Sequence, residues 1–283
     1  MLFFVLNEYH MKRFLLAFLL PACLTWSSMQ QMLDWAPVKD VIQKADLGTW
    51  VFFDVDEVLI TPEDTVFHPA NHNVFETHAK RLSNKMDREA LIGLWGALFS
   101  VRKARLVDAE ILEVLKLVKQ KRLQTFALTH CGTGKVGCIE RLEDWRIKEL
   151  KSLGIHFEQL NDYEIEWIFE DLPGKHGIPI LKKGVIFASA LDKGEVLSKV
   201  FDVIGHQPQR VIFVDDKYDN LMSVKAACLE RGIEFIGFEY LAVAHSKPSQ
   251  IDLRKVEIQF QILENEKKWL SDREIELFME ESR

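Results

Sequence analysis

Two carboxylates stand one residue apart in this chain, because Asp54 and Asp56 follow the apolar run Trp50–Phe53. A short run of aromatic and β-branched residues is typical of a buried strand in a parallel sheet. In open α/β sheets, ligands and chemistry lie at the carboxyl ends of the strands, so we expect both carboxylates at that edge. Such a pair is also common in turns and helix caps, and a functional role therefore requires partners elsewhere in the chain.

Residues that could supply such partners follow in order along the chain. Thr129 ends a second apolar run, and Lys193 opens a predicted helix. Asp215 and Asp216 end a third apolar run, and Asp219 follows within one helical turn. Alternating strands and helices bring groups of this kind to one edge of a parallel sheet. Converging carboxylates repel one another unless a cation lies between them, and an all-oxygen ligand set favours Mg²⁺.

Each of these residues has a simpler explanation when it is taken alone. Thr129 is compatible with an ordinary strand end, Lys193 with a surface lysine, and Asp215 with a helix cap. Their order along the chain and their places at strand ends favour a catalytic site over these separate roles.

The set resembles the four signature motifs of the haloacid dehalogenase-like (HAD) superfamily. The matching positions are Asp54, Asp56, Thr129, Lys193, Asp215 and Asp216. Within that superfamily the chain is most similar to an uncharacterised bacterial branch of domains of unknown function. The resemblance covers roughly residues 47–239, and the segment Trp269–Asp272 fits the same branch.

The resemblance implies a Mg²⁺-dependent phosphohydrolase that acts on a small organic phosphate. Asp54 resembles the nucleophile that forms an aspartyl-phosphate, which splits one difficult displacement into two easier steps. Asp56 would protonate the leaving oxygen and then deprotonate the attacking water. Thr129 and Lys193 would hold the phosphoryl oxygens. True dehalogenases of this fold lack the second acid, so its presence here implies hydrolysis of phosphate esters.

The same resemblance implies a metal shell made of carboxylates. The candidate ligands are Asp54, Asp56 (through its backbone carbonyl), Asp215, Asp216 and Asp219. Asp216 and Asp219 are alternatives for completing or orienting the shell, and the sequence leaves that choice open. Glu57 departs from the pattern, because many relatives carry a small residue there, and this affects the following turn or substrate access.

Alternating strands and helices predict an α/β fold with a three-layer parallel sheet. The resemblance implies that this fold is of the Rossmann-like, HAD-like type, with a small helical cap inserted after the first strand. Further strands are expected at residues 165–169, 184–188 and 234–238. An apolar stripe at helical spacing predicts the cap. It consists of Leu91, Leu94, Trp95, Leu98 and Phe99. The predicted division assigns residues 29–60 and 106–283 to the core domain and residues 61–105 to the cap.

The N-terminus predicts a secretory signal peptide over residues 11–28. A basic start at Met11–Arg13 precedes a short apolar segment and small residues, and the segment is too short to span a bilayer. We therefore expect an exported protein, periplasmic or secreted, without a stable membrane span. A buried N-terminal helix is the alternative. The start codon (Met1 or Met11), the cleavage site and lipidation at Cys23 stay open.

Composition limits the remaining choices. The 283 residues carry a formal net charge of −7, which argues against a general nucleic-acid binder. Cys131 and Cys138 are close enough in sequence to form a disulfide in an oxidising compartment, and this too stays open. The expected partner is a small phosphorylated substrate, and neither its identity nor the oligomeric state follows from the sequence.

Two other functional classes fit parts of the pattern. A receiver-like phospho-acceptor domain also places an Asp, a Thr and a Lys around Mg²⁺, but the long insertions and the predicted signal peptide disfavour it. An exported HAD-fold protein that binds a partner or acts as an effector without turnover is the second alternative, although no motif position is lost.

Overall fold

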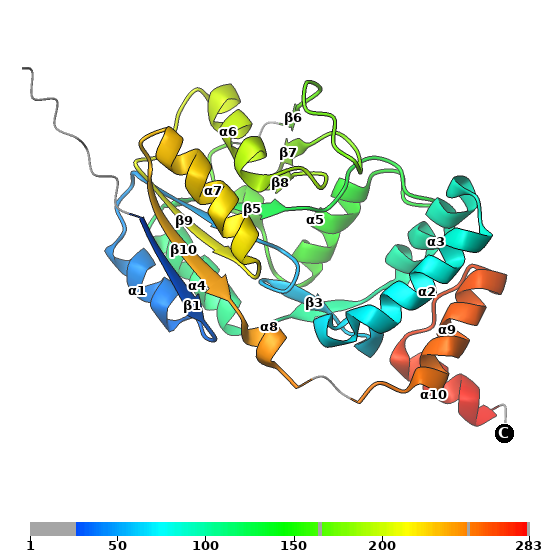
Figure 1. Ribbon diagram of the computed structural model, residues 1–283. Coiled ribbons are helices and arrows are strands. Elements are labelled where there is room, and N and C mark those ends of the chain that lie inside the picture. The colour runs from blue at the N-terminus through cyan, green and yellow to red at the C-terminus, as the bar shows by residue number, and fades with distance from the viewer. Residues whose placement is uncertain (1–26, 164–165, 248–249, 282–283) are drawn as a thin grey trace, which may run out of the picture.

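The computed structural model describes residues 27–163, 166–247 and 250–281. In these residues an eight-stranded sheet with helices on both faces lies beside a separate group of helices (Figure 1). The strand order is β1 (Ser27–Met32), β10 (Glu234–Tyr240), β9 (Arg210–Asp215), β2 (Thr49–Phe53), β5 (Gln124–Thr129), β8 (Val185–Phe187), β7 (Ile180–Lys182) and β6 (Trp167–Ile168). The first six of these strands pair in parallel, and the last two pairings are antiparallel.

The alternation of side chains along each strand explains the two helical layers. Phe53, Val51 and Val214 pack on one face with α1 (Ala36–Lys44), α4 (Glu110–Gln120) and α5 (Leu142–Ser152). Phe52 and Phe213 pack on the other face with α6 (Lys193–Ile204) and α7 (Tyr218–Glu230). Because strand residues point alternately to opposite faces, one apolar run serves both cores. The predicted three-layer, mostly parallel α/β fold is therefore confirmed.

The insertion after the first core strand is helical, as predicted. A small antiparallel pair, β3 (Ile60–Pro62) and β4 (Ala104–Leu106), closes its base. Between these strands lie two short 3₁₀ turns and two helices. They are η1 (Thr65–Phe67), η2 (Pro69–Asn71), α2 (His72–Lys85) and α3 (Arg88–Val101). We call residues 61–105 the cap.

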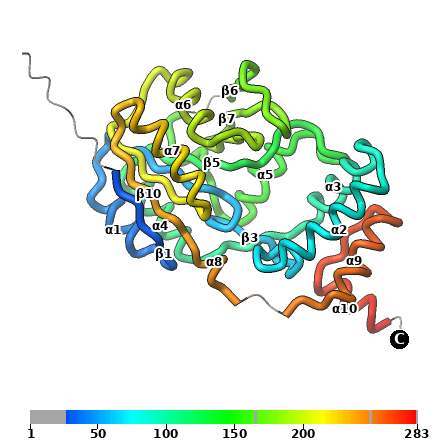
Figure 2. Tube along the Cα trace, viewed as in Figure 1, coloured from blue at the N-terminus to red at the C-terminus, as the bar shows by residue number. Residues whose placement is uncertain are grey.

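The C-terminal helices pack on the cap and not on the sheet (Figures 1 and 2). After β10 the chain forms the short α8 (Ala242–His245) and then α9 (Leu253–Glu266) and α10 (Asp272–Glu281). One apolar cluster joins the two segments: Val66, Leu82, Leu94 and Leu98 from the cap meet Val256, Phe260, Leu263 and Trp269. The predicted division assigned these helices to the core domain, and in the structure their apolar faces pack into the same cluster as the cap residues.

Several local features also differ from the sequence-based prediction. The sequence of residues 29–48 indicates a short amphipathic helix before the first core strand, but the structure has strand β1 followed by the shorter α1. Strand β7 was not expected, and it forms an antiparallel hairpin with β8. The predicted strand at 165–169 is reduced to β6.

The predicted signal peptide lies almost wholly outside the described residues, of which Ser27 is the first. Cys131 and Cys138 are both free thiols. Among the described helices none has the length and apolar character needed to cross a membrane.

Candidate active site

The pairing of β2 with β9 brings the first and last acidic motifs together. Phe53 lies opposite Val214, and the amide of Asp54 donates to the Val214 carbonyl at 2.8 Å. The next residues, Asp54 and Asp215, therefore leave their strands side by side. Asp54, Asp215 and Asp216 each place one carboxylate oxygen within 4.8 Å of the others.

Lys193 reaches this cluster because the start of α6 is fixed in three ways. Asp192 caps the helix by accepting from the Glu195 amide at 2.9 Å. The Ser223 hydroxyl of α7 donates to the same Asp192 carboxylate at 2.5 Å and accepts from the Gly194 amide at 2.8 Å. A Cβ on Gly194 would lie 2.4 Å from the Ser223 carbonyl oxygen, so only glycine allows α6 to approach α7 this closely. Asp192 thus caps the helix, Lys193 extends from its first turn, and Gly194 permits the close packing of α6 on α7.

The Lys193 side chain is fully buried and forms two ion pairs. Its Nζ lies 2.9 Å from Asp54 Oδ1 and 2.7 Å from Asp215 Oδ2. Burial alone would lower the pKa of Lys193, but the charges of Asp54 and Asp215 outweigh it and raise that pKa. Lys193 is therefore held as a cation at the centre of the cluster.

One lysine does not neutralise three carboxylates. Burial raises the pKa of Asp54 well above its usual range, Lys193 opposes that change, and Asp215 and Asp216 reinforce it. Burial, followed by the charge of Asp215, raises the pKa of Asp216 to about 6. The buried carboxylates therefore repel one another, and a bound cation would reduce this repulsion and stabilise their charged forms.

The two adjacent acids have different hydrogen-bond partners. Asp215 Oδ1 accepts from the Lys217 amide and from Asn220 Nδ2, both at 2.9 Å, and Asp215 Oδ2 accepts from Lys193. Asp216 Oδ1 is buried and has no hydrogen-bond partner among the described residues. A carboxylate with a buried, unpartnered oxygen, in a cluster with two other carboxylates, suits a hard divalent ion such as Mg²⁺.

The structure does not bring Asp219 into this group. Asp219 lies in the first turn of α7, is exposed, and is absent from the cluster of carboxylates found among the described residues. Between the two alternatives left open by the sequence, the geometry favours Asp216. Its neighbour Asn220, which the sequence analysis did not select, is the residue of this turn that reaches the site.

Thr129 ends β5 at the same edge of the sheet. Because Phe53 lies opposite Ala127, Thr129 comes level with the residues just beyond the end of β2. Its side chain is buried, and its Oγ1 accepts from the Cys131 amide at 3.1 Å, which fixes the first turn after the strand.

Asp56 lines a cavity below the cap, where it pairs with Arg146 and lies within the electrostatic influence of Arg102. The sequence analysis missed both arginines. Arg146 of α5 lies 3.1 Å from Asp56 Oδ1 and 2.6 Å from Glu149 Oε2, and Glu149 also pairs with Arg102 at the end of α3 at 3.1 Å. Both guanidinium groups lie over the Trp145 ring: that of Arg146 is 5.2 Å from the ring centroid, and that of Arg102 is 5.5 Å from it. Burial raises the pKa of Asp56, but Arg146 and Arg102 outweigh it and hold that pKa below its usual value.

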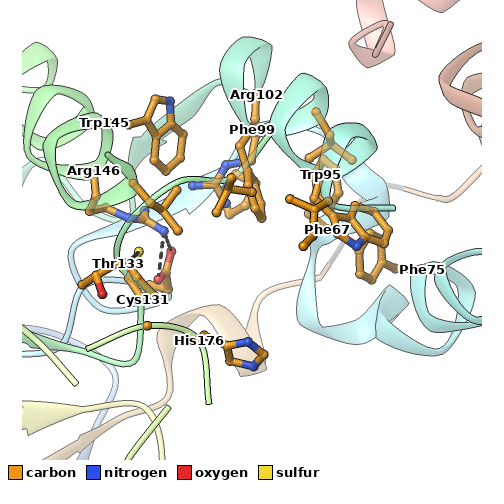
Figure 3. A pocket seen from close by; sticks show the side chains of 18 of the residues that line it. Phe67, Phe75, Trp95, Phe99, Arg102, Cys131, Thr133, Trp145, Arg146 and His176 are labelled. Atoms are coloured by element: carbon orange, nitrogen blue, oxygen red, sulfur yellow. Dashed lines mark hydrogen bonds and ion pairs between the residues drawn. The ribbon is translucent and has the colours of Figure 1, made fainter. Parts of the chain in front are cut away.

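A cavity of about 830 Å³ opens between Asp56 and the cap (Figure 3). Helices α2 and α3 line one side, and α5 with the loops at residues 131–136 and 175–177 lines the other. Volumes of this size are typical of small-molecule sites, so the cap and the carboxylate edge together form a pocket with its acidic residue at one end.

Comparison with known proteins gives three results. A family described as "Protein of unknown function (DUF2608)" matches residues 31–276. A protein of Chlamydia muridarum named "Putative outer membrane protein" is 24% identical over 266 residues, which cover 90% of this chain and 95% of that protein. An uncharacterised protein of Rickettsia prowazekii is 23% identical over 241 residues, which cover 84% and 86%.

Among solved structures, a haloacid dehalogenase-like family hydrolase from Streptococcus pneumoniae is similar to this chain at 16% sequence identity. The match covers 67% of this chain and 93% of that chain, with a TM-score of 0.35. A TM-score at this level does not establish a shared fold.

Proposed function

Because the chain belongs to the family described as "Protein of unknown function (DUF2608)", whose description names no activity, we propose a function from the site itself: a Mg²⁺-dependent phosphohydrolase that acts on a phosphomonoester through Asp54. The observation that carries this proposal is the meeting of Asp54, Asp215 and Asp216 within 4.8 Å beside a fully buried lysine. The four HAD-like motifs in the sequence support the same chemistry.

Asp54 is the proposed nucleophile. Its carboxylate would attack phosphorus and form an aspartyl-phosphate as the bond to the leaving oxygen breaks, and water would then release inorganic phosphate and restore the carboxylate. Lys193 holds the attacking carboxylate in place through its 2.9 Å contact and would balance charge on the phosphoryl oxygens. Thr129, which lies at the same sheet edge, would hold one of those oxygens.

Asp56 is the proposed acid and base. It would give a proton to the leaving oxygen and take one from the attacking water. Its ion pair with Arg146 favours the carboxylate, which is the form that accepts a proton from water. This residue also lines the cavity in which a leaving group would lie.

The proposed metal site consists of Asp54 and Asp216, with Asp215 as a third carboxylate that also orients Lys193. A divalent cation at this site would neutralise the charge gathered by the three acids and polarise a phosphoryl oxygen. The free Oδ1 of Asp216 supports its place in the shell. Asp219 is not included, since it lies outside the cluster.

Substitution of the nucleophile tests the proposal. In the presence of Mg²⁺ the purified protein is expected to hydrolyse p-nitrophenyl phosphate, and Asp54→Asn is expected to lower kcat by at least about a thousandfold, because the nucleophile is lost. Asp219→Asn is the matched control, since this exposed Asp lies outside the carboxylate cluster, and it should retain wild-type turnover. Full activity of Asp54→Asn would remove the proposed mechanism.

Export is also part of the proposal. Residues 11–28 predict a signal peptide, and the name of the Chlamydia muridarum relative refers to the outer membrane. Fractionation of cells that express the full chain checks this, and recovery of the protein only from the cytoplasm would contradict it.

A further inference from the structure

The cavity between the cap and the sheet edge has two chemically different ends (Figure 3). At one end Arg146 bonds to the carboxylate of Asp56, with Cys131 and Thr133 nearby. At the other end lie three aromatic rings of the cap, Phe67, Phe75 and Trp95. A ligand suited to these two ends is polar at one end and carries an apolar group at the other.

Five aromatic side chains of the cavity are only partly buried, although four of them also pack against the apolar cluster of the cap. The five are Phe67, Phe75, Trp95, Phe99 and Trp145. Ring contacts join them to one another, as in the 5.5 Å Phe67–Phe75 pair, the 6.0 Å Phe75–Trp95 pair and the 5.8 Å Phe99–Trp145 pair. Phe67 also lies 5.3 Å from Trp269 of the C-terminal segment.

Leu94, on the same helix as Trp95 and Phe99, is fully buried against α9. Helix α3 thus has one face that completes the cap's core and another that presents rings to the cavity. Apolar surface kept partly open inside a cavity is what an apolar ligand group covers.

The charges around the cavity favour an anion. Five Lys and Arg side chains line it against two carboxylates, although the whole chain has a net charge of −7. The positive groups are Arg88, Arg102, Lys135, Arg146 and Lys175. Arg102, Lys135 and Arg146 are paired with Glu149, Glu140 and Asp56. Arg88 and Lys175 form no ion pair among the described residues, so their charges are the ones that attract an anionic ligand to this opening.

We propose that the substrate is an amphiphilic phosphomonoester, with one phosphate at the carboxylate edge and an apolar alkyl or aryl leaving group along the aromatic rings of the cap. This inference rests on the proposed phosphohydrolase function and narrows it to a substrate class. In this arrangement the bond that breaks lies near Asp56, and the leaving alcohol departs into the aromatic end of the cavity.

A series of n-alkyl phosphates from ethyl to octyl tests the inference, because their leaving groups have closely similar basicity and differ in apolar length. For the wild-type protein with Mg²⁺, kcat/KM is expected to rise roughly threefold to fourfold for each methylene that enters the cavity, until the cavity is filled. Direct binding of ethyl and octyl phosphate to Asp54→Asn, measured by calorimetry, should show the same preference without any turnover.

Two variants locate the effect in the cavity. Trp95→Ala and, separately, Phe99→Ala are expected to reduce the octyl-to-ethyl ratio of kcat/KM by about tenfold, because each removes ring surface that the chain would cover. Val101→Ala is the matched control: Val101 lies on the same helix, is 50% exposed and does not line the cavity, so the ratio should stay at its wild-type value.

The outcomes separate this inference from the proposed function. Equal kcat/KM and equal binding across the series would overturn the amphiphilic class and leave a phosphohydrolase of another specificity. Tighter binding of octyl phosphate without turnover of any member would support the apolar subsite and contradict the hydrolase. An unchanged octyl-to-ethyl ratio in both folded ring variants would also overturn the inference.

Discussion

At the scale of single residues, Asp215 and Asp216 show how position separates two identical side chains. Asp215 is the last residue of β9, points to Lys193, and has both carboxylate oxygens occupied by donors. Asp216 is one residue further, and one of its oxygens has no donor among the described residues. The first acid therefore orients the lysine, and the second offers a lone pair to a cation.

Lys193 is the residue whose removal should affect folding most directly. Lys193→Met leaves Asp54 and Asp215 buried without their shared cation, and breaking a buried pair in this way costs about 3–5 kcal/mol in the free energy of unfolding. Urea unfolding in the presence of EDTA measures the change without a contribution from bound metal.

The control for this substitution lies on the same helix. Lys199 forms an ion pair with Asp171 at the surface, where both side chains remain partly exposed. Surface pairs contribute less than about 1 kcal/mol, so Lys199→Met should change the free energy of unfolding little. A loss in Lys193→Met no larger than in Lys199→Met would contradict the assignment of a buried, structurally required lysine.

The sequence predicts some site residues better than others. Asp54, Thr129 and Asp215 were found because each ends an apolar run, which is a local signal. Arg146 was missed because it reaches Asp56 from a helix that is distant in sequence. Asn220 was missed because asparagine is an ordinary surface residue, and nothing in the sequence marks its contact with Asp215. No periodicity marks such residues, since their role depends on which helix face the fold turns inward.

At the scale of elements, the site depends on how closely α6 packs against α7. Gly194→Ala would place a Cβ 2.4 Å from the carbonyl oxygen of Ser223, so the two helices must separate. We expect a loss of about 1–3 kcal/mol in the free energy of unfolding and reduced turnover, because Lys193 moves with the helix start. Urea unfolding and the p-nitrophenyl phosphate assay measure the two effects.

Gly93→Ala is the matched control for this prediction. Gly93 lies inside helix α3, and a Cβ built on it meets nothing within 4 Å. Alanine in an open helical position should stabilise the protein by up to about 1 kcal/mol. If both substitutions destabilised the protein equally, the close approach of α6 to α7 would not explain the need for Gly194.

The elements that the sequence did not predict share a physical cause. Strand β1 has the sequence Ser-Ser-Met-Gln-Gln-Met, with no β-branched residue, and it forms because β10 offers a parallel edge along its whole length. Likewise, the amphipathic stripe of α9 indicates an apolar face but not which partner covers it. The formation of β1 and the position of α9 both depend on contacts with distant segments, which the sequence of one segment does not specify.

At the scale of the whole molecule, the C-terminal segment completes the cap. Trp269 Nε1 donates to Asp64 Oδ2 at 2.8 Å, and the amide of Asp272 donates to Asp64 Oδ1 at 2.9 Å. In return, Asp272 Oδ2 accepts from the amide of Thr65 at 2.7 Å. The C-terminal segment is thus fixed to the base of the cap by hydrogen bonds, and α9 and α10 lie beside α2 and α3 (Figure 1).

The central claim is that carboxylates distant in sequence hold one divalent cation, and a whole-molecule property tests it. A ligand that binds only the folded state stabilises it by about 2.7 kcal/mol at a hundred times its Kd. Mg²⁺ should therefore raise the Tm of the wild-type protein by several degrees relative to the protein in EDTA. Asp216→Asn should lose most of this shift, whereas Asp219→Asn should keep it.

Thermal unfolding with and without Mg²⁺, for the wild type and these two variants, is thus the most direct measurement, because it needs no knowledge of the substrate. The structure predicts a Mg²⁺-dependent rise in Tm that requires Asp216 and not Asp219. The same Tm for the wild type with Mg²⁺ and with EDTA, or an equal rise in Asp216→Asn, would contradict a metal site at Asp54, Asp215 and Asp216.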